Sequence, residues 1–524
     1  MTGGSWGWNS CRRSVPCRHG SCEGKISPRR TAKNKEAATS PGTRTFAGGY
    51  FFRDFIGQPL SELVDLGVPH QVILSLTDPQ GVSLLPAVQK GAQVKAGQVI
   101  ARAPGRIAAI LLSSVSGSVE DVRMADGGPG AITIRADGSP GWTQIEMAGP
   151  EAASGPPETI ERIISQSGIS AIPTRFATAA IGATDVENVI INGVNADVYN
   201  PSLPLIAGAR LADLASAVRI LRRIYPTAGF SVAFDTRSRS LLQELCSAAP
   251  QGGITFHLLK PKFPQQREEM LLPVVLGRPF PYGYGAINCG VLVLDIQTVL
   301  AVHDAVVLGK PAIERIIALS GPAFTRNIHV RARIGTVVSD IVDSRLRSPG
   351  RFRLVENSLL TGRKIANPAS TPVGQKTDNL IAVPEKEVEG FLPFAGPGFR
   401  KDSHSLAFAS RFLPLGKEAD TNLHGEERVC ISCGFCENVC PVRILPSLLH
   451  RYVKRGIIDE TVLRYRITRC IDCNLCTYVC TSKIDLASLI RQGKARLAAA
   501  GYGEISSEVP PERLKGIAAK EPAL

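Results

Sequence analysis

Hydrophobic residues follow different periods in different stretches of the chain, and the changes of period mark out its regions. From Val72 to about Ile134 the apolar residues form short runs at strand spacing, separated by glycine turns. Beyond a Gly-, Pro- and Glu-rich link near 138–157, apolar strands alternate with amphipathic helices up to Val307. Such alternation is typical of a parallel, Rossmann-like sheet. From about 311 to 400 a period of two returns, and it predicts a small mixed β domain.

The alternating region yields a specific set of predicted elements. Strands are expected at 188–192, 230–234, 254–259 and 290–294. Helices are expected at 211–221, 241–248, 267–276 and 296–307. The preceding β-rich region is interpreted as a barrel-sandwich (biotinyl-like) hammerhead, in which Gly91 and Gly97 permit tight turns. No lysine occurs between Ala101 and Ser118, so this region is not a swinging-arm carrier of biotin or lipoate.

Charge adds a basic tail to this picture. The formal net charge is +14, and residues 1–45 hold nine Lys and Arg against two Glu. That segment has no apolar period and is rich in Gly, Ser and Pro, so we interpret it as a disordered basic tail and expect no nucleic-acid partner. No run of about 18 apolar residues occurs, and no membrane-spanning helix is predicted.

Eight of the thirteen cysteines fall in two runs of identical spacing. The runs are Cys430-x2-Cys433-x2-Cys436-x3-Cys440 and Cys470-x2-Cys473-x2-Cys476-x3-Cys480. In bacterial two-cluster ferredoxins this spacing supplies three thiolates to one [4Fe–4S] cluster and the fourth to the other. We therefore predict two clusters and a role in electron transfer. The first cluster is expected on Cys430, Cys433, Cys436 and Cys480, and the second on Cys470, Cys473, Cys476 and Cys440.

Structural zinc is the alternative for clustered cysteines. Zinc sites use separated Cys-x2-Cys pairs, and the third and fourth cysteine of each run would be surplus, so iron–sulfur is preferred. Between the runs, four apolar residues fall on one face of an amphipathic helix: Leu445, Leu448, Leu449 and Val453. Residues 420–499 are therefore predicted to form an α-helical two-[4Fe–4S] ferredoxin domain, followed by a polar tail at 500–524. Clustered thiolates indicate a reducing compartment, the cytoplasm.

The order of these regions resembles the C subunit of the Rnf electron-transport complex. Lys262-Phe-Pro-Gln265 is similar to the Lys-Tyr-Pro-Gln signature of that family, and Leu276-Gly-Arg278 follows it as in the family. The run Val306-Val-Leu-Gly-Lys-Pro-Ala-Ile-Glu-Arg315 looks like its Val-Val-x-Gly-Lys-Pro-Leu-Ile-Glu-Arg motif. Ile190-Ile-Asn-Gly193 looks like its strand that ends in Asn-Gly. The resemblance covers about residues 47–499.

Two further segments, Ser358-Leu-Leu-Thr-Gly362 and Phe394-Ala-Gly-Pro-Gly-Phe399, are similar to the A subunit of the sodium-translocating NADH:quinone reductase. Together the resemblances imply a multidomain α/β chain. They place a barrel-sandwich N-terminal domain at 46–137, a Rossmann-like domain similar to the 51 kDa subunit of complex I at 158–310, and a β-grasp-like (SLBB) domain at 311–400.

The function that this resemblance implies is that of a peripheral electron-transfer subunit on the inner face of the cell membrane. Its partners would be membrane-embedded subunits of an Rnf/Nqr-like complex, and ferredoxin or NADH are candidate redox partners. The alternative is a soluble flavin- and NADH-dependent reductase of the cobalamin-reductase type, which shares this domain order. No catalytic residue is assigned for either.

One departure from the family concerns the flavin. Members that bind FMN carry a Gly-Leu-Gly-Gly-Ala-Gly-Phe-Pro-Thr loop, whose bare backbone approaches the phosphate. Here the stretch from Ser167 to Thr174 keeps one glycine and places Ile169 and Ile172 where they would crowd a phosphate. The acidic pair that follows the family's Asn-Gly is replaced by Val194-Asn-Ala-Asp197.

We therefore expect weak or absent FMN binding, and little NADH oxidation by the isolated chain. Branched side chains disfavour the positive φ angles that a close phosphate-binding turn needs. Titration of FMN into the purified protein, followed by flavin fluorescence, measures the affinity. Tight stoichiometric binding with bleaching of the flavin by NADH would favour the flavin-reductase alternative instead.

Overall fold

The computed structural model describes residues 43–78, 81–104, 106–124, 130–174, 186–248, 253–347, 350–385, 399–405, 409–421 and 427–502. Most of the predicted basic tail, residues 394–398 of the second resemblance and the end of the polar tail lie outside these ranges. All described residues belong to one compact unit, Pro41–Leu524. None of the helices that the structure describes is long and apolar enough to cross a membrane.

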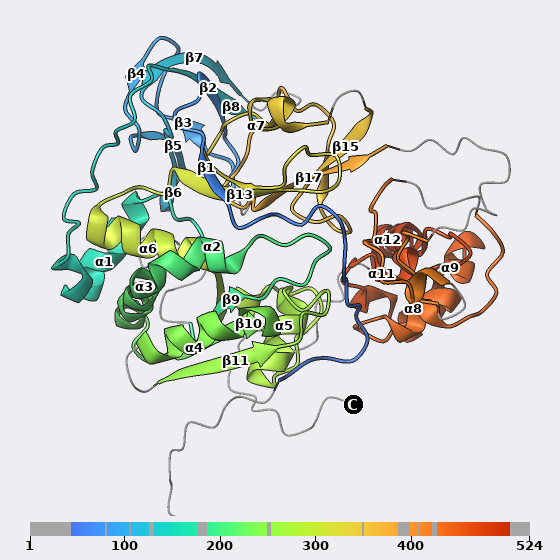
Figure 1. Cartoon of the computed structure of the whole chain (residues 1–524). Coiled ribbons are helices and arrows are strands. Elements are labelled where there is room, and N and C mark those ends of the chain that lie inside the picture. The colour runs from blue at the N-terminus through green and yellow to red at the C-terminus, as the bar shows by residue number, and fades with distance from the viewer. Residues whose placement is uncertain are drawn as a thin grey trace, which may run out of the picture. The chain divides into compact units, whose positions relative to one another are not determined.

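Two small antiparallel sheets form the N-terminal β region (Figure 1). The first contains β2 (Gln71–Ser75), β8 (Ala131–Ala136), β7 (Gly117–Arg123) and β4 (Gln93–Val94). The second contains β3 (Leu85–Pro86), β5 (Val99–Ala103) and β6 (Arg106–Leu112). Apolar residues that alternate along the strands, among them Val72, Ile100 and Ile132, form a common core between the two sheets. Gly91 and Gly97 have φ angles of 87° and 88°, as expected of tight turns.

A four-stranded parallel sheet follows, in the order β11-β10-β9-β12. Its strands are β9 (Asn188–Gly193), β10 (Gly229–Asp235), β11 (Ile254–Leu259) and β12 (Val291–Asp295), close to the predicted ranges. Its helices are α1 (Pro157–Gln166), α2 (Leu203–Ala207), α3 (Leu211–Ile224), α4 (Arg239–Ala248), α5 (Glu268–Leu276) and α6 (Ile296–Leu308).

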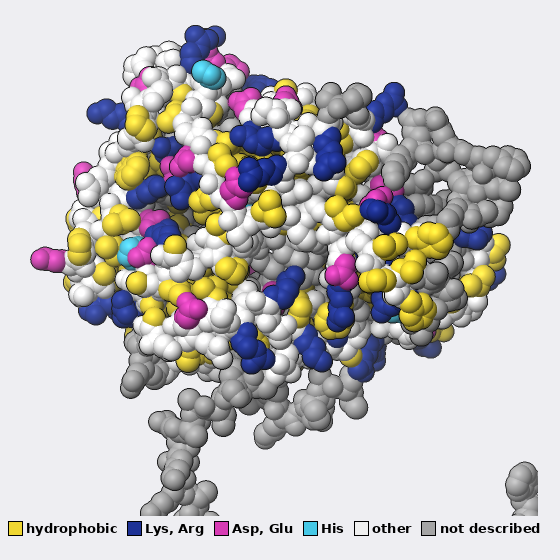
Figure 2. All heavy atoms as spheres, in the orientation of Figure 1, with side chains coloured by type: hydrophobic (Ala, Val, Ile, Leu, Met, Phe, Trp, Pro, Cys, Tyr) yellow, Lys and Arg dark blue, Asp and Glu magenta, His cyan; other side chains and the backbone are white. Residues whose placement is uncertain are grey.

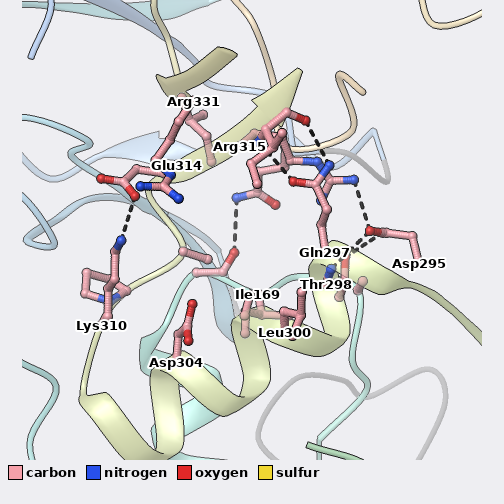
Figure 3. Close-up of a pocket in the computed structure, with 18 of the residues that line it drawn as sticks. Ile169, Asp295, Gln297, Thr298, Leu300, Asp304, Lys310, Glu314, Arg315 and Arg331 are labelled. Carbon is pink, nitrogen blue, oxygen red and sulfur yellow. Dashed lines mark hydrogen bonds and ion pairs between the residues drawn. The ribbon is translucent and has the colours of Figure 1, made fainter. Parts of the chain in front are cut away.

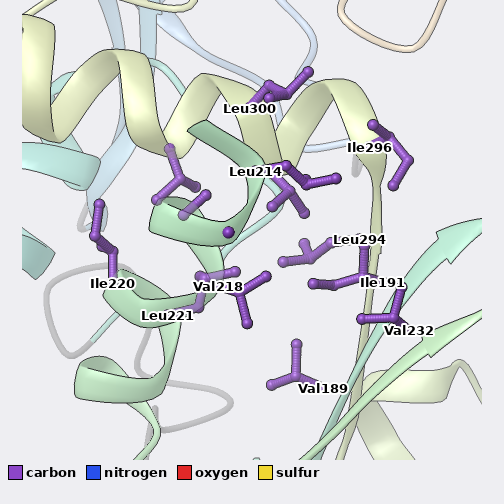
Figure 4. Packing of buried hydrophobic residues seen from close by; sticks show 14 of the residues in the cluster. Val189, Ile191, Leu214, Val218, Ile220, Leu221, Val232, Leu294, Ile296 and Leu300 are labelled. Carbon is purple, nitrogen blue, oxygen red and sulfur yellow. The ribbon is translucent and has the colours of Figure 1, made fainter. Parts of the chain in front are cut away.

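Both faces of this sheet are covered, because its strands are apolar on both sides. Figure 4 shows Leu214, Val218 and Leu221 of α3 directed at strand residues such as Ile191 and Val232. The other face packs on α5 through a separate apolar cluster. This two-sided burial explains why the strands are continuous hydrophobic runs in the sequence.

The third sheet is mixed and has the order β1-β14-β13-β17-β15-β16. Its strands are β1 (Leu63–Asp65), β13 (Glu314–Ser320), β14 (His329–Arg333), β15 (Phe352–Glu356), β16 (Arg363–Ile365) and β17 (Asn379–Pro384), with α7 (Val338–Val342) packed beside them. Strand β1 lies within the range predicted for the barrel-sandwich region, yet it pairs in parallel with β14. The N-terminal segment therefore belongs to two regions at once.

The cysteine-bearing region is helical, with its own core. It contains α8 (Phe435–Asn438), α9 (Pro446–Lys454), α10 (Glu460–Arg464), α11 (Leu475–Tyr478) and α12 (Leu486–Leu497). Leu449 and Val453 of α9 are buried as the predicted amphipathic helix requires, but Leu445 is 38% exposed. Leu445 is the N-cap residue of α9 and so stands outside the packed face.

We expect Leu221→Ala to destabilise the parallel-sheet region by about 2–5 kcal/mol, because it removes a fully buried side chain from the contact between α3 and the strands. The surface variant Leu308→Ala, at a position that is 53% exposed in the same region, is the matched control. Thermal and urea unfolding of both variants measure the difference. Equal stability of the two variants would contradict the packing in Figure 4.

Candidate metal centre

The two cysteine runs share one backbone conformation, displaced by 40 residues. Helix α8 in the first run corresponds to α11 in the second, and both follow a residue in the left-handed region. Three pairs of residues have positive φ at equivalent positions: Ser432 and Asp472 (55° and 54°), Gly434 and Asn474 (74° and 62°), and Arg443 and Lys483 (53° and 57°). Left-handed conformations are uncommon for non-glycine residues and cluster at functional sites. Their repetition at each equivalent position points to a shared function of the two loops.

The first group of thiols combines both runs. Cys430, Cys433, Cys436 and Cys480 line one small cavity, whose apolar wall includes Ile484. Burial is the main cause that raises the pKa of Cys436, to about 12, and the neighbouring charges of Cys433, Cys480 and Cys430 raise it further. The fourth thiol of this group therefore comes from the end of the second run.

The second group mirrors the first. Burial raises the pKa of Cys473 to about 12, and the nearby thiols of Cys470 and Cys440 add to the shift. Cys440 likewise acts on Cys470 and Cys476, whose pKa values are raised chiefly by burial. Cys440, from the end of the first run, is thus the neighbour of three thiols of the second. The structure brings together the two sets of four residues that the sequence singled out.

Backbone N–H groups point at several of these sulfur atoms. Cys440 receives hydrogen bonds from the N–H groups of Ile444, Val442 and Arg443, and Cys470 receives one from Asp472. Such nests of backbone donors favour an anionic occupant and are found around iron–sulfur groups. Burial raises the pKa of Cys430, but hydrogen bonds from the Arg451 side chain and the Ser432 backbone outweigh it and lower the pKa below its usual value.

The donor set fits iron–sulfur chemistry. Each group offers four thiols, none of them in a disulfide, with apolar walls and backbone donors around them. Within the part of the chain that the structure describes, no three His, Cys, Asp or Glu side chains converge as ligands of one metal ion. A cubane cluster takes its thiolates at four separate iron corners.

The two groups differ in their exposure. Cys433 is exposed, and Val429 and Ile431 beside it are 86% and 70% exposed, whereas Cys473 and Cys476 are buried. Figure 2 shows hydrophobic side chains gathered on the surface where the cysteine-bearing region lies. The first thiol group therefore reaches the surface at Cys433, where the neighbouring exposed side chains are apolar.

A cluster of aromatic residues ties the second group to the rest of the chain. The hydroxyl groups of Tyr50 and Tyr478 each donate to Asp402 Oδ2 at 2.7 Å. The ring of Tyr478 lies 5.5 Å from that of Tyr50 and 5.3 Å from that of Phe52, and this apolar cluster also includes Cys473. Burial and the Asp402 carboxylate raise the pKa of both phenols, so they remain protonated donors.

The N-terminal segment also approaches the first run closely. Gly49 N–H donates to the Val439 carbonyl at 2.8 Å. Gly48 has a φ of 73°, and a Cβ atom there would lie 2.5 Å from the Cys440 carbonyl oxygen. Only glycine satisfies both requirements. No local pattern predicts this contact or the Tyr50–Asp402–Tyr478 bridge, because their members are far apart in the chain.

The loop that departs from the family's flavin-binding motif borders a pocket of about 480 Å³ (Figure 3). This loop is bound to the third sheet region, since Gln375 Nε2 donates to the Gly168 carbonyl at 3.0 Å. Ile169 and Ile172 are buried in the parallel-sheet core. Ile172 therefore does not line this pocket, whereas Ile169 does (Figure 3), and the crowding of a phosphate by Ile169 stays a prediction.

Three of the five basic residues that line this pocket are paired with acids in the following way. Arg315 is buried and lies 2.6 Å from Asp378 Oδ1 and 3.1 Å from Asp295 Oδ1. Lys310 pairs with Glu314 at 2.6 Å. Arg210 pairs with Asp304. In this pocket a phosphate would compete with carboxylates for each of these cations.

Comparison with known proteins matches two parts of the chain. Residues 58–138 match the RnfC barrel sandwich hybrid domain, and residues 429–484 match a 4Fe-4S dicluster domain. The first match lies within the predicted barrel-sandwich region, apart from residue 138, and the second contains all eight cysteines of the two runs. The predicted combination of a barrel-sandwich domain with an iron–sulfur domain is thereby confirmed.

Curated relatives extend the likeness over most of the chain. The C subunit of the ion-translocating oxidoreductase complex of Pseudomonas aeruginosa is 29% identical over 83% of this chain and 53% of its own length. The C subunit of the proton-translocating ferredoxin:NAD(+) oxidoreductase complex of Clostridium ljungdahlii is 26% identical over 88% of this chain and 96% of its own. The chain thus spans about half the length of the Pseudomonas relative. The resemblance to the Rnf C subunit is confirmed, whereas the likeness to the quinone-reductase A subunit and the SLBB assignment stay predictions.

Among solved structures, an NAD+-reducing [NiFe]-hydrogenase is 13% identical and covers 72% of this chain and 69% of its own, with a TM-score of 0.39. A score of that size supports no argument about fold or function.

We expect Tyr478→Phe to destabilise the protein by about 1.5–3 kcal/mol, because it removes a buried hydrogen bond to the Asp402 carboxylate. Tyr502→Phe, at an exposed position, is the control. Unfolding of the iron-loaded variants in urea measures the cost. A variant as stable as the control would mean that the bridge contributes nothing to holding the cysteine-bearing region.

Proposed function

We propose that this chain is an electron-transfer subunit of an ion-translocating oxidoreductase complex, and that it binds two [4Fe–4S] clusters. The observation that carries the proposal is the exchange of the fourth cysteine between the two runs. Cys480 lines the cavity of Cys430, Cys433 and Cys436, and Cys440 lies with the thiols of the second run. This is the arrangement that two-cluster ferredoxins use.

The proposed ligands of the first cluster are Cys430, Cys433, Cys436 and Cys480, and those of the second are Cys470, Cys473, Cys476 and Cys440. When bound, such clusters supply one-electron chemistry. The chain's own contribution is to hold the two thiol sets in one small core and to direct backbone N–H groups at the sulfur atoms. These donors stabilise the added negative charge of the reduced state and so help to set the potential.

The proposed partners are membrane-embedded subunits, which would hold the chain at the membrane as a peripheral subunit. Two observations support this. The curated relatives are subunits of ion-translocating complexes. The described helices contain no membrane span.

The proposed domains are those expected from the sequence, at 46–137, 158–310, 311–400 and 420–499, and the β-grasp-like identity of the third belongs to this proposal. The separate sheets of the first three ranges support this division, except that β1 of the first range pairs with β14 of the third. FMN and NADH remain outside the proposal, because three of the five basic residues of the pocket beside Gly168 are paired with acids.

We expect about eight irons per chain after anaerobic reconstitution, and two cubane EPR signals that interact on reduction. Cys440→Ser should reduce the iron content to about four and remove the signal of the second cluster, because its thiol completes that set. Iron analysis and EPR on the same sample measure both.

Cys289→Ser is the matched control, since this half-buried free thiol lies outside the cysteine-bearing region and should leave both signals intact. Stoichiometric zinc in the wild-type protein would refute the proposal. Loss of the first cluster alone in Cys440→Ser would refute the crossed assignment.

A further inference from the structure

A groove of about 1490 Å³ opens beside the second thiol group. Cys470 lines it, together with the neighbouring Ile471 and Asp472. Its opposite wall is formed by α5, by the loop 279–284 and by the N-terminal segment 43–47. Cys470 is the one cysteine in this lining, so the groove is a direct approach to the second group from the surface.

The lining of this groove is strongly basic. It contains six cationic residues against two acidic ones, Glu269 and Asp472. The cations are Arg44, Arg267, Arg443, Arg466, Arg469 and Lys494. Both acids are already paired, since Glu269 lies 2.7 Å from Arg267 and Asp472 lies 2.6 Å from Lys494. The described groove residues therefore carry four more positive than negative charges, which exceeds the charge of about −2 that an oxidised cluster with its four thiolates would add.

Three arginines account for most of this excess. Arg443, Arg466 and Arg469 are all exposed, and none of them forms an ion pair with another residue that the structure describes. Gathering like charges costs electrostatic energy and gains no contact within the fold. Their placement is explained if they meet a negatively charged surface from outside.

The internal repeat differs in charge at the position just before the first cysteine of each run. The position equivalent to Arg469, 40 residues earlier, is Val429, which is 86% exposed. At this position the second run carries a cation, whereas the first carries an exposed apolar side chain. A shared structural requirement of the loops would have given both the same flank.

The size and exposure of the groove indicate the kind of ligand. Small-molecule sites usually enclose about 300–1,000 Å³ and surround the ligand with a few buried polar groups. This groove is larger, and its unpaired cations are exposed rather than buried. Tyr282 on the opposite wall is 39% exposed and adds aromatic surface of the kind that protein interfaces use. These features fit a protein better than a nucleotide.

We propose that this groove is the docking surface for an acidic electron-carrier protein, which exchanges electrons with the group held by Cys470. This inference rests on the proposed function, because it needs a cluster at the second site. The exchange is a one-electron step. The reduced centre of the carrier loses the electron that the second cluster of this chain gains, and no bond or proton changes hands.

The test compares two double charge reversals in the iron-loaded protein. Arg466→Glu/Arg469→Glu alters the groove, whereas Arg455→Glu/Arg464→Glu changes the net charge equally at exposed positions of the same region outside the groove. The probe is a bacterial two-[4Fe–4S] ferredoxin of strongly negative net charge. Its affinity is measured by sedimentation at low and at high salt, and electron transfer from its reduced form is followed by stopped-flow absorbance.

At low salt, we expect the groove variant to lose at least about tenfold in ferredoxin affinity and in electron-transfer rate, and the control variant to lose much less. The reason is that electrostatic attraction of the ferredoxin depends on the charges at the docking surface itself. Salt of about 1 M should abolish the difference. Equal losses in both variants, or none in either, would overturn the proposal. So would a groove variant that binds ferredoxin normally but no longer binds phosphatidylglycerol vesicles, which would assign the groove to a lipid surface.

Measuring the iron–sulfur cluster content distinguishes failure of the docking proposal from failure of the proposed function. If iron and EPR signals are intact and dithionite reduces both variants, an unchanged transfer rate counts against the docking surface alone. If the wild-type protein assembles no clusters, the proposed function itself fails.

Discussion

The exchange of one cysteine between two equivalent loops is the constraint on which the rest of the cysteine-bearing region depends. Cys480 faces the first three thiols, and Cys440 lies among the last three. Neither run supplies a complete set alone, so the two halves must come together before either group of four exists. The helices that follow the loops, α9 and α12, pack against each other and form the core that keeps the halves in register.

That core is connected to the other regions by a few buried contacts. Asp402 accepts hydrogen bonds from Tyr50 and Tyr478, one from the N-terminal segment and one from α11. Gly48 lets the same segment pass against the carbonyl of Cys440. The second thiol group thus lies at the joint between regions, with aromatic residues on one side and the basic groove near Cys470 on the other. The first group lies toward the surface, where Cys433 is exposed.

The sequence predicted the elements of this protein better than it predicted their assembly. The strands and helices of the parallel sheet could be located because Ile190, Val232 and their neighbours are buried on both faces, which leaves a strong periodic signal. The eight cysteines were identifiable because their spacing is set by the chemistry of the ligands. The Asp402 bridge joins residues 352 and 76 positions apart and has no local pattern. Ile172 illustrates a different difficulty, since a branched residue in a degraded loop looks like an obstruction until its side chain is seen in the core.

The pairing of β1 with β14 has a consequence for how the chain is made. Leu63 leaves the ribosome long before its partner His329 has been synthesised. At synthesis rates of about 5–20 residues per second, this delay amounts to roughly 10–50 s. During that interval the barrel-sandwich and parallel-sheet regions can fold, while the early strand waits with its edge unpaired. When β14 has been synthesised, β1 can pair with it and complete the third sheet. The N-terminal segment is therefore joined to the third sheet only late in synthesis.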